Sequence, residues 1–484
     1  MKALIIVLAL ICLGSPYGWA QENLNSRINH ISLATDDSLA YGNDYTTYGM
    51  IIPTVQVAQW KDGYVVTYVN SNWHSKLFFT DAQFNKTSKE YELANRIVYQ
   101  VVTDNGEIAL LAADKQVDSD GDIFSNFMYF IKFSASGGIL MEKTIIGSNH
   151  IKRPNETELD DWGNYLMKWT GHFYVTFFPI QHNFRKIAPP DIHQGDCTYF
   201  IKPDGSILSY SDWGASHSFE QRMAIGEDYL IQVAKGDAYP RGLAIDYVAI
   251  NNYEIEELER GWKDQNNPDL NYGYDPIKSF NSSPYKVSGS LGANYVPFSL
   301  GDVVILEKNA AIVSFSTKDK KTAHDIGILT TRPQFGYKGK VKYITNTPTI
   351  CEHSVRMARV AENGILIMWK QFDVKTAKKK IAQIEKRLDT WDADEEIFRD
   401  HNLDQNMMAM IDTNGKYLSK PQKVTHADWY YTISLKEFQT PWHDIIDGYA
   451  NHSYSPFLHL HNGNLAWAHH QHKAKQIDIY SLVK

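Results

Sequence analysis

The sequence predicts an all-β fold, a seven-bladed β-propeller of four-stranded antiparallel blades. Three observations lead to this prediction. A strand–turn–strand outline recurs along the chain, a second hairpin with a Gly-containing turn follows it in several places, and each end of the chain carries a strand without a hairpin partner. Two hairpins make one four-stranded blade, and seven such units make a ring.

The first hairpin is most complete in Ser216–Ile245, where an apolar strand turns at Gly226 and runs back to a polar loop. Related outlines cover Cys351–Phe372, with its turn at Asn363-Gly364, and Asn451–His472, with its turn at Asn462-Gly463; less polar versions are centred on Asp62-Gly63, Asn105-Gly106, Gly171 and Gly301. The second hairpin is predicted in Phe133–Leu140, Ile201–Leu208 and Ile411–Leu418. A pair of irregular β-sandwiches is the alternative fold.

The terminal strands are expected to close the ring. Arg27–Thr35 has no nearby hairpin partner, and Gln476–Lys484 has no fourth strand after it. We therefore predict that these two strands share one blade, which removes an exposed sheet edge. The seven blades are then expected to start near Tyr48, Arg96, Asn164, His217, Asn294, His353 and His452.

The N-terminus has the pattern of a secretory signal peptide. Met1-Lys2 precedes the apolar run Ala3–Leu13, and Gly18-Trp19-Ala20 offers small residues for cleavage. Residues 1–20 are expected to be removed, leaving one propeller domain over 21–484 in a soluble protein that is secreted or periplasmic. No second apolar stretch approaches the ~20 residues that span a bilayer. The two remaining cysteines, Cys197 and Cys351, could pair or stay free.

Composition fits a globular β protein and excludes some partners. The chain has 484 residues, is 43% hydrophobic and 13% aromatic, and has a formal charge of −8. This charge favours neither nucleic acid nor an anionic membrane surface as a general partner. A monomer is the expected state.

Two insertions interrupt the repeat. A helix is predicted within an insertion near 375–400, because Ile381, Ile384, Leu388 and Trp391 recur at helical spacing. It is expected to lie against the sixth blade, with its lysines as a solvated face. The second insertion, near 426–449, is rich in Trp and Tyr; it is either a cap packed on its own side chains or a platform for sugar rings.

The histidines are expected to gather on one face of the disc. In a propeller blade, the start of the first strand and the loop after the second strand lie on the same face. That rule places His217, His353 and His452 at equivalent strand starts, and it adds from loops His74, His182, His193, His324, His469, His470 and His472. Arg185, Arg222, Arg241, Arg356 and Lys318–Lys321 share this face, whereas His172, His459 and His461 are expected on the other. Such a face is suited to an anionic ligand.

Each of these residues also has a structural interpretation. A His-Ser pair at a strand start often makes hydrogen bonds between blades, Asp237 can cap its turn, and Tyr239 can be a packed aromatic. A divalent metal held by His217, His353 and His452 stays open as an alternative; the run of His469, His470 and His472 is less suited, because neighbours on a strand point to opposite faces. No other cofactor is predicted.

The residue types on this face suit β-elimination on a uronic acid polymer. This reaction needs a cation at the carboxylate, a base of near-neutral pKa and a His or Tyr that protonates the leaving oxygen. Glycoside hydrolysis needs two facing carboxylates instead, and the strand starts carry histidines. On chemical grounds alone, Tyr239 and Arg222 or Arg241 are candidates for the acid and the cation.

The segment Asn451–His472, with its strand-start His, its Pro, its Asn-Gly turn and its return-loop histidines, resembles BNR-repeat propellers, the group that includes seven-bladed ulvan lyases. The resemblance is close over about one blade. It implies a secreted polysaccharide lyase in which His452 and His470 or His472 form the catalytic histidine pair. His217 completes the catalytic candidates, and the predicted substrate-binding residues are His353, Arg356, His193 and His472. A propeller that binds carbohydrate or protein without catalysis, and a metal-dependent hydrolase, are the alternatives.

Overall fold

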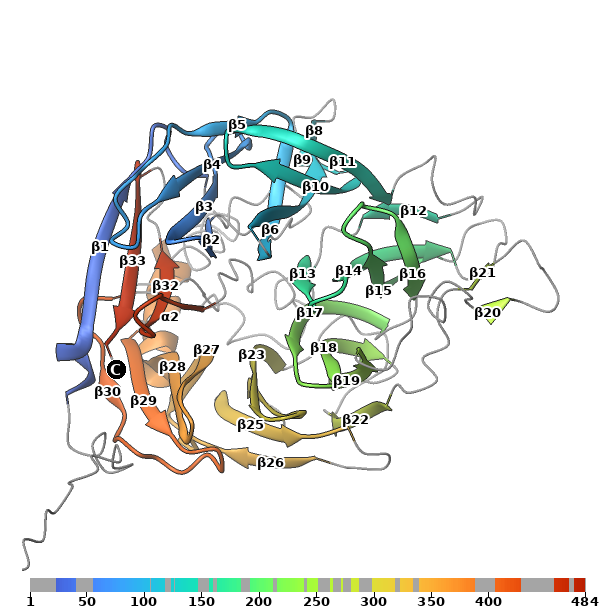
Figure 1. Cartoon of the computed structure of the whole chain (residues 1–484). Coiled ribbons are helices and arrows are strands. Elements are labelled where there is room, and N and C mark those ends of the chain that lie inside the picture. The colour runs from blue at the N-terminus through green and yellow to red at the C-terminus, as the bar shows by residue number, and fades with distance from the viewer. Residues whose placement is uncertain are drawn as a thin grey trace, which may run out of the picture.

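The computed structural model describes residues 23–40, 55–104, 106–117, 123–125, 127–146, 156–159, 163–183, 192–211, 216–238, 242–250, 262–263, 271–272, 280–286, 298–317, 323–333, 339–387, 405–427, 457–469 and 474–483. Within these residues, seven antiparallel sheets form a ring (Figure 1), which confirms the predicted seven-bladed propeller. Six of these sheets have four strands, and the third sheet along the chain has five because it includes the extra strand β12.

The blades follow one another along the chain, each running from the axis to the rim. Blade 1 comprises β2 (Val55–Trp60), β3 (Gly63–Val69), β4 (Ser75–Thr80) and β5 (Tyr91–Leu93); blade 2, β6 (Arg96–Asp104), β7 (Glu107–Asp114), β10 (Met128–Ser134) and β11 (Gly138–Ile146); blade 3, β12 (Glu156–Leu159) and β13 (Leu166–Trp169), then β14 (Tyr174–Asn183), β15 (Ile192–Ile201) and β16 (Ile207–Ser211). Blade 4 comprises β17 (Ser216–Ile225), β18 (Tyr229–Ala238), β19 (Gly242–Ala249) and β22 (Phe280–Lys286).

The remaining blades follow the same plan. Blade 5 comprises β23 (Phe298–Glu307), β24 (Ala310–Thr317), β25 (Asp325–Thr331) and β26 (Lys340–Tyr343); blade 6, β27 (Ile350–Ala361), β28 (Gly364–Asp373), β29 (Gln405–Ile411) and β30 (Gln422–Lys423); blade 7, β31 (Leu458–His459), β32 (Leu465–His469), β33 (Gln476–Leu482) and β1 (Ile28–Ala34). Outside the blades lie a short helix η1 (Leu24–Arg27), the helix α2 (Val374–Arg387) and the two-stranded ribbons β8 (Gln116–Val117) with β9 (Ile123–Phe124) and β20 (Trp262–Lys263) with β21 (Asn271–Tyr272).

The ring is closed by the two ends of the chain, as predicted. β1 is the outer strand of blade 7 and pairs antiparallel with β33, from Ile28 opposite Leu482 to Ala34 opposite Gln476. Blade 7 therefore takes three strands from the C-terminal end and one from the N-terminal end (Figure 1). Unfolding either end would leave the other end's strand of blade 7 without its partner, which couples the two ends energetically.

The predicted turn at Gly301 is wrong. Gly301 lies inside β23, beside a bulge between Leu300 and Val303, and the turn to β24 is at Lys308 and Asn309. A Cβ at position 301 would lie 2.3 Å from Ser314 Oγ and 2.9 Å from the carbonyl oxygen of Val355. The glycine therefore serves the close approach of blade 6 to blade 5 and not a turn.

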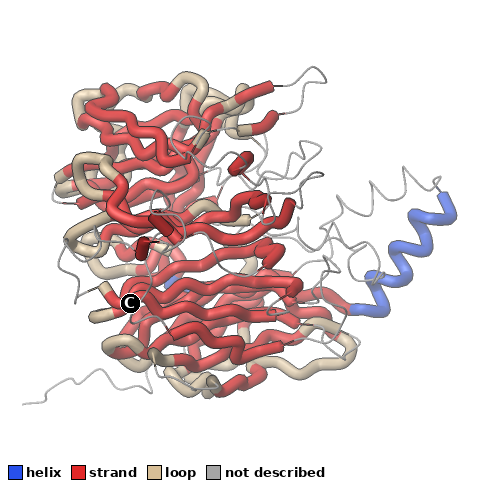
Figure 2. The backbone as a smooth tube through the Cα atoms, turned by 90° about the vertical axis from the view of Figure 1, so that its right-hand side faces the viewer, coloured by secondary structure: helices blue, strands red, loops and turns tan. Residues whose placement is uncertain are grey.

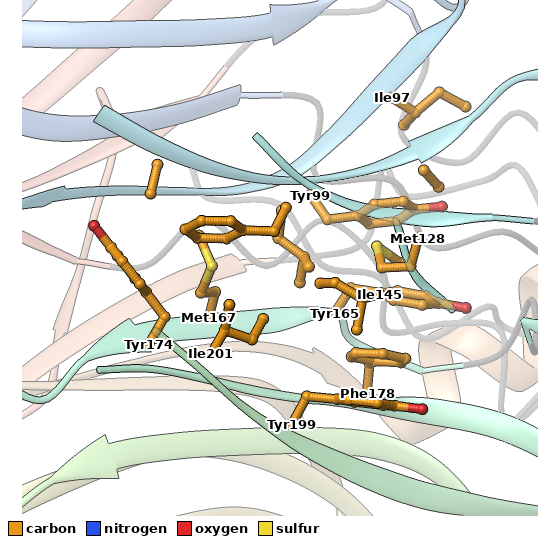
Figure 3. Close-up of a cluster of buried hydrophobic side chains, with 14 of the residues drawn as sticks. Ile97, Tyr99, Met128, Ile145, Tyr165, Met167, Tyr174, Phe178, Tyr199 and Ile201 are labelled. Carbon is orange, nitrogen blue, oxygen red and sulfur yellow. The ribbon is translucent and has the colours of Figure 1, made fainter. Parts of the chain in front are cut away.

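One buried apolar cluster lies at each of the seven blade interfaces of the described structure. The cluster between blades 2 and 3 is built around aromatic rings (Figure 3). Tyr99 and Tyr165 have ring centroids 4.4 Å apart, and Phe178 lies 5.6 Å from Tyr165 and 5.9 Å from Tyr199. Full burial of such a side chain contributes roughly 1.5–3 kcal/mol, so these interfaces hold the blades in the ring.

Cys197 and Cys351 are both buried, in blades 3 and 6, and form no disulfide with each other. The helix α2 leaves the end of β28 and projects away from the disc (Figure 2), whereas we expected it to lie against blade 6. Ala377 in its first turns is fully buried, but most of its lysines are exposed. Among the described residues, no helix is both long and apolar enough to cross a membrane.

Candidate functional site

The two faces of the disc differ in the histidines that the described strands place there. We call the side on which the innermost strands begin the front face, and the side of the turns between first and second strands the back face. Strand ends and the loops after second strands place on the front face His74, His182, His193, His217, His324, His353, His426 and His469. The back face has His172, His459 and His461. His182 and His193 are direct partners across β14 and β15.

Arg222, a predicted catalytic residue, lies in the interior where blades 3, 4 and 5 meet. Its Nε donates to the carbonyl oxygen of Gly301 at 2.6 Å and its Nη2 to that of Leu300 at 2.9 Å, while Nη1 donates to Asn164 Oδ1 at 2.6 Å. The side chain is 2% exposed. Arg222 therefore fastens β17 to its neighbours, and its catalytic role stays a prediction.

Arg356, predicted to bind substrate, joins blade 6 to blade 5 in a similar way. Its Nε donates to Asp302 Oδ2 at 2.8 Å, and the same oxygen accepts the backbone N–H of Met357 at 2.7 Å. The guanidinium lies over the ring of Phe457, 4.7 Å from its centroid. Because both charges of the pair are buried, loss of one partner would leave the other uncompensated.

His353 lies nearer the front face, in the irregular part of β27. The pairing with β28 shifts between His353 and Arg356, and Ser354 adopts a positive φ of 54°. This bulge sets the direction of the His353 ring, whose Nδ1 is 2.7 Å from Ser354 Oγ. The ring is fully buried and packs 5.5 Å from that of Phe372. Its direct partner across the strands is the buried Lys370.

A carboxyl pair beside His353 was missed by the sequence analysis. Glu352 and Asp325 are both 2% exposed, and their side chains share a hydrogen bond between blades 5 and 6. Thr347 donates from Oγ1 to Glu352 Oε1 at 2.7 Å and from its N–H to Asp325 Oδ1 at 2.9 Å. Burial, with the neighbouring Asp325 carboxylate, raises the pKa of Glu352 to about 7. The sequence does contain a hint of this pair, because Glu352 directly precedes His353 near the start of β27 and Asp325 is the first residue of β25.

Lys168 lies on β13, the innermost strand of blade 3. Within the described residues it has no hydrogen bond or ion pair, and its side chain is half-buried. Burial lowers the pKa of this amine, and the carboxylate of Asp302 partly opposes the effect. Near the axis, burial therefore disfavours the protonated, charged form of Lys168.

A Ser, a His and an Asp meet on the outer strands of blade 7, but their geometry does not suit nucleophilic catalysis. His30 Nε2 is 2.9 Å from Asp478 Oδ1, and Ser32 Oγ is 3.3 Å from the same nitrogen. In a catalytic triad the hydroxyl and the carboxylate use different ring nitrogens. Ser32 instead donates to Asp478 Oδ1 at 2.9 Å, so the three residues fasten β1 to β33.

The other predicted site residues are only partly placed. Tyr239, Arg241, His452, His470 and His472 lie outside the described residues, as does most of the aromatic insertion near 426–449. For His193 and His217 the structure describes the backbone, which puts both on the front face. Whether these side chains converge with those of His353 and Arg356 stays a prediction.

The described residues contain no group of three or more His, Cys, Asp or Glu side chains that could hold a metal ion. The metal site suggested by His217, His353 and His452 includes a residue outside the described part of the chain.

Comparison with known proteins finds no matching family model and no curated protein with significant sequence similarity. Solved structures with a similar fold include a protein of unknown function from Dyadobacter fermentans, with 9% identity, a TM-score of 0.38, and coverage of 71% of this chain and 94% of that one. A subtype N10 neuraminidase-like protein of A/little yellow-shouldered bat/Guatemala matches with 8% identity and a TM-score of 0.35, covering 71% and 94%. An alpha-L-arabinofuranosidase from Fusarium graminearum matches with 10% identity and a TM-score of 0.34, covering 70% and 92%. The fold assignment rests on the sheet topology of this chain itself.

Proposed function

We propose that this protein is an exported polysaccharide lyase, which binds an anionic, uronic acid-containing polysaccharide on the front face and cleaves it by β-elimination. The observation that carries the proposal is the asymmetry of the disc, because the described strand ends gather histidines on the front face of an otherwise acidic protein. Histidine is the side chain whose ordinary pKa suits proton transfer near neutral pH.

The chemistry of the polymer explains why these residue types fit elimination. A uronic acid carries a carboxylate beside the carbon that loses its proton, and a nearby cation stabilises the negative charge that develops there. A neutral imidazole can accept that proton, and an imidazolium or a phenol can protonate the leaving oxygen. In this proposal His452 and His470 or His472 transfer the protons with Tyr239, and Arg241 neutralises the carboxylate.

Arg222 and Arg356 take an indirect part in the proposal. Their hydrogen bonds point into the blade interfaces, so they position the innermost strands that lead to the front face. His353 is buried beside Lys370 and is assigned to support the site from below the surface.

The test is a screen of polyuronates, read by the near-ultraviolet absorbance of the unsaturated ends that elimination creates. Replacement of His452 or His470 by Gln is expected to lower turnover by roughly 10²–10⁴-fold, the usual contribution of a general acid or base. His172→Gln is the matched control, since His172 is exposed on the back face and should leave turnover unchanged. Equal effects of front-face and back-face substitutions would contradict the site.

A non-catalytic carbohydrate-binding propeller is the second candidate. It is favoured by the bonds of Arg222 and Arg356, since the two described arginines of the predicted site are used within the fold. Retention of a polyuronate on the protein with no unsaturated product, under conditions in which the polymer is soluble and in excess, would favour this candidate over the lyase.

Export is part of the proposal and has its own test. Mass spectrometry of the mature protein should find Gln21 as its first residue. An intact Met1 on material collected outside the cytoplasm would contradict the cleavage site.

A further inference from the structure

The helix α2 concentrates positive charge on a protein that is acidic overall. Its sequence VKTAKKKIAQIEKR carries Lys375, Lys378, Lys379, Lys380, Lys386 and Arg387 against the single acidic residue Glu385. The whole chain has a formal charge of −8, so α2 departs from the rest of the molecule in the sign of its charge. Figure 2 shows it standing clear of the disc.

Three of these lysines form a row along the solvent side. Lys375, Lys379 and Lys386 are spaced by four and seven residues, which returns to the same side of a helix, and all three are exposed. At 1.5 Å of rise per residue the row is about 16 Å long. Within the described residues none of the three side chains has a hydrogen bond or an ion pair; the backbone N–H of Lys375 donates to the Asp373 carboxylate, and the charged Lys375 side chain attracts that carboxylate at longer range.

This arrangement costs the helix stability. Like charges four residues apart repel by a few tenths of a kcal/mol, and Lys375 stands at the positive end of the helix dipole, where the Asp373 carboxylate just before the first turn partly offsets its charge. Asp373 begins the helix by accepting hydrogen bonds at 2.7 Å from both the N–H and the Oγ1 of Thr376. A solvated surface helix gains from alternating Glu and Lys, whereas a row of lysines repels itself and gains from an anion bound beside it.

The helix starts on the front face. Asp373 pairs with Ile350, the first residue of the innermost strand of blade 6, so α2 leaves the disc on the side that gathers the histidines. The apolar side of its first turns is covered, since Ala377 is fully buried and Val374 half-buried. A helix lying flat on a lipid surface needs that apolar side free, which disfavours a membrane as the partner.

We propose that the row Lys375, Lys379 and Lys386 is a docking surface for an anionic polysaccharide, which it holds beside the front face. The choice of a polysaccharide as the ligand rests on the function proposed above, whereas the positive charge of the surface follows from the residues of α2 alone. Exposed lysines on a projecting helix match the repeated carboxylates of a uronic acid chain by charge, and such contacts raise the association rate and are weakened by salt.

The test compares two triple variants of the full chain for binding to polygalacturonate, measured by titration calorimetry at low and at physiological salt. Lys375→Gln, Lys379→Gln and Lys386→Gln together are expected to weaken binding about tenfold, as exposed ion pairs contribute up to ~1 kcal/mol each, and to make its salt dependence shallower. The control is Lys61→Gln, Lys308→Gln and Lys416→Gln, which removes the same charge from exposed positions at back-face turns. Glutamine is about as good a helix former as lysine, so far-ultraviolet circular dichroism should be unchanged.

Several results would overturn the docking surface: wild-type affinity in the α2 triple variant, equal losses in both triple variants, or no binding of polygalacturonate by the wild-type protein. Binding to phosphatidylserine vesicles or to a DNA duplex that depends on the three lysines, with none to polygalacturonate, would also overturn it. Binding of polygalacturonate that depends on the three lysines, without formation of unsaturated product, would support the docking surface while contradicting the lyase.

Discussion

Replacement of Glu352 by Gln should change the pH dependence of folding stability. Glu352 is buried between blades 5 and 6, and its pKa is raised from 4.5 to about 7 in the folded protein. The folded state therefore holds a proton that the unfolded state releases above about pH 4.5. Stability is greatest when both states are protonated, and it falls as pH rises from the unfolded pKa to the folded one.

The size of the effect follows from the two pKa values. A difference of about 2.5 units corresponds to about 3 kcal/mol of stability lost between roughly pH 4.5 and 7. Glutamine has the shape of the protonated carboxyl group, can still accept the hydrogen bond from Thr347, and does not ionise. The Glu352→Gln protein should therefore be close to wild type at pH 4.5 and more stable by up to about 3 kcal/mol at pH 8.

The assay is urea unfolding of both proteins at several pH values, taking the difference in free energy of unfolding at each pH. Titrating groups distant from Glu352 contribute equally to both proteins and cancel in this difference, so what is left belongs to Glu352 and its neighbour Asp325. Glu362→Gln, at the exposed turn before β28, is the control and should give a difference that does not vary with pH. A difference for Glu352→Gln that is also flat from pH 4.5 to 8 would refute the raised pKa of Glu352.

Three further outcomes are expected. Arg356→Met should destabilise the protein by about 3–5 kcal/mol, because it leaves Asp302 buried without its cation, while turnover per folded molecule stays the same; lost turnover at unchanged thermal stability would instead make it a direct substrate ligand. Lys168 has a lowered pKa in the folded protein, so it makes stability rise with pH in the alkaline range. Lys168→Met should abolish this rise, which unfolding measured from pH 8 to 10.5 would detect. His30→Gln should cost less than about 1 kcal/mol because the His30 side chain is 43% exposed, but should speed hydrogen exchange of the β1 amides selectively; uniform exchange rates would argue against its role in closing the ring.

The parts of the fold that the sequence predicts correctly depend on local patterns. Asn-Gly and Asp-Gly turns between apolar strands recur at Asp62-Gly63, Asn105-Gly106, Asn363-Gly364 and Asn462-Gly463, so the first hairpins of blades 1, 2, 6 and 7 and the start of blade 2 at Arg96 follow from them. The pairing of β1 with β33 follows from two strands that lack local partners. The Gly301 turn was misplaced because glycine is needed there for contact between blades, which short-range patterns do not report.

The site is harder to predict because its side chains are shared between blades. Arginine on an innermost strand suggests a ligand for an anion, yet Arg222 donates hydrogen bonds to Gly301 and Leu300, which lie far along the chain. The carboxyl pair was missed for the same reason, since only the contact of blades 5 and 6 brings Asp325 to Glu352. Nothing in the spacing of these residues distinguishes a surface charge from one that joins two sheets.

The most direct test of the proposed function is the mass of the products formed from a defined oligouronate. Elimination breaks the glycosidic bond without consuming water, so the two fragments together should weigh as much as the parent, with the double bond at the new non-reducing end. Fragments that are together heavier by one water would show hydrolysis and contradict the account. So would an oligouronate that is bound by the front face and recovered at its full length.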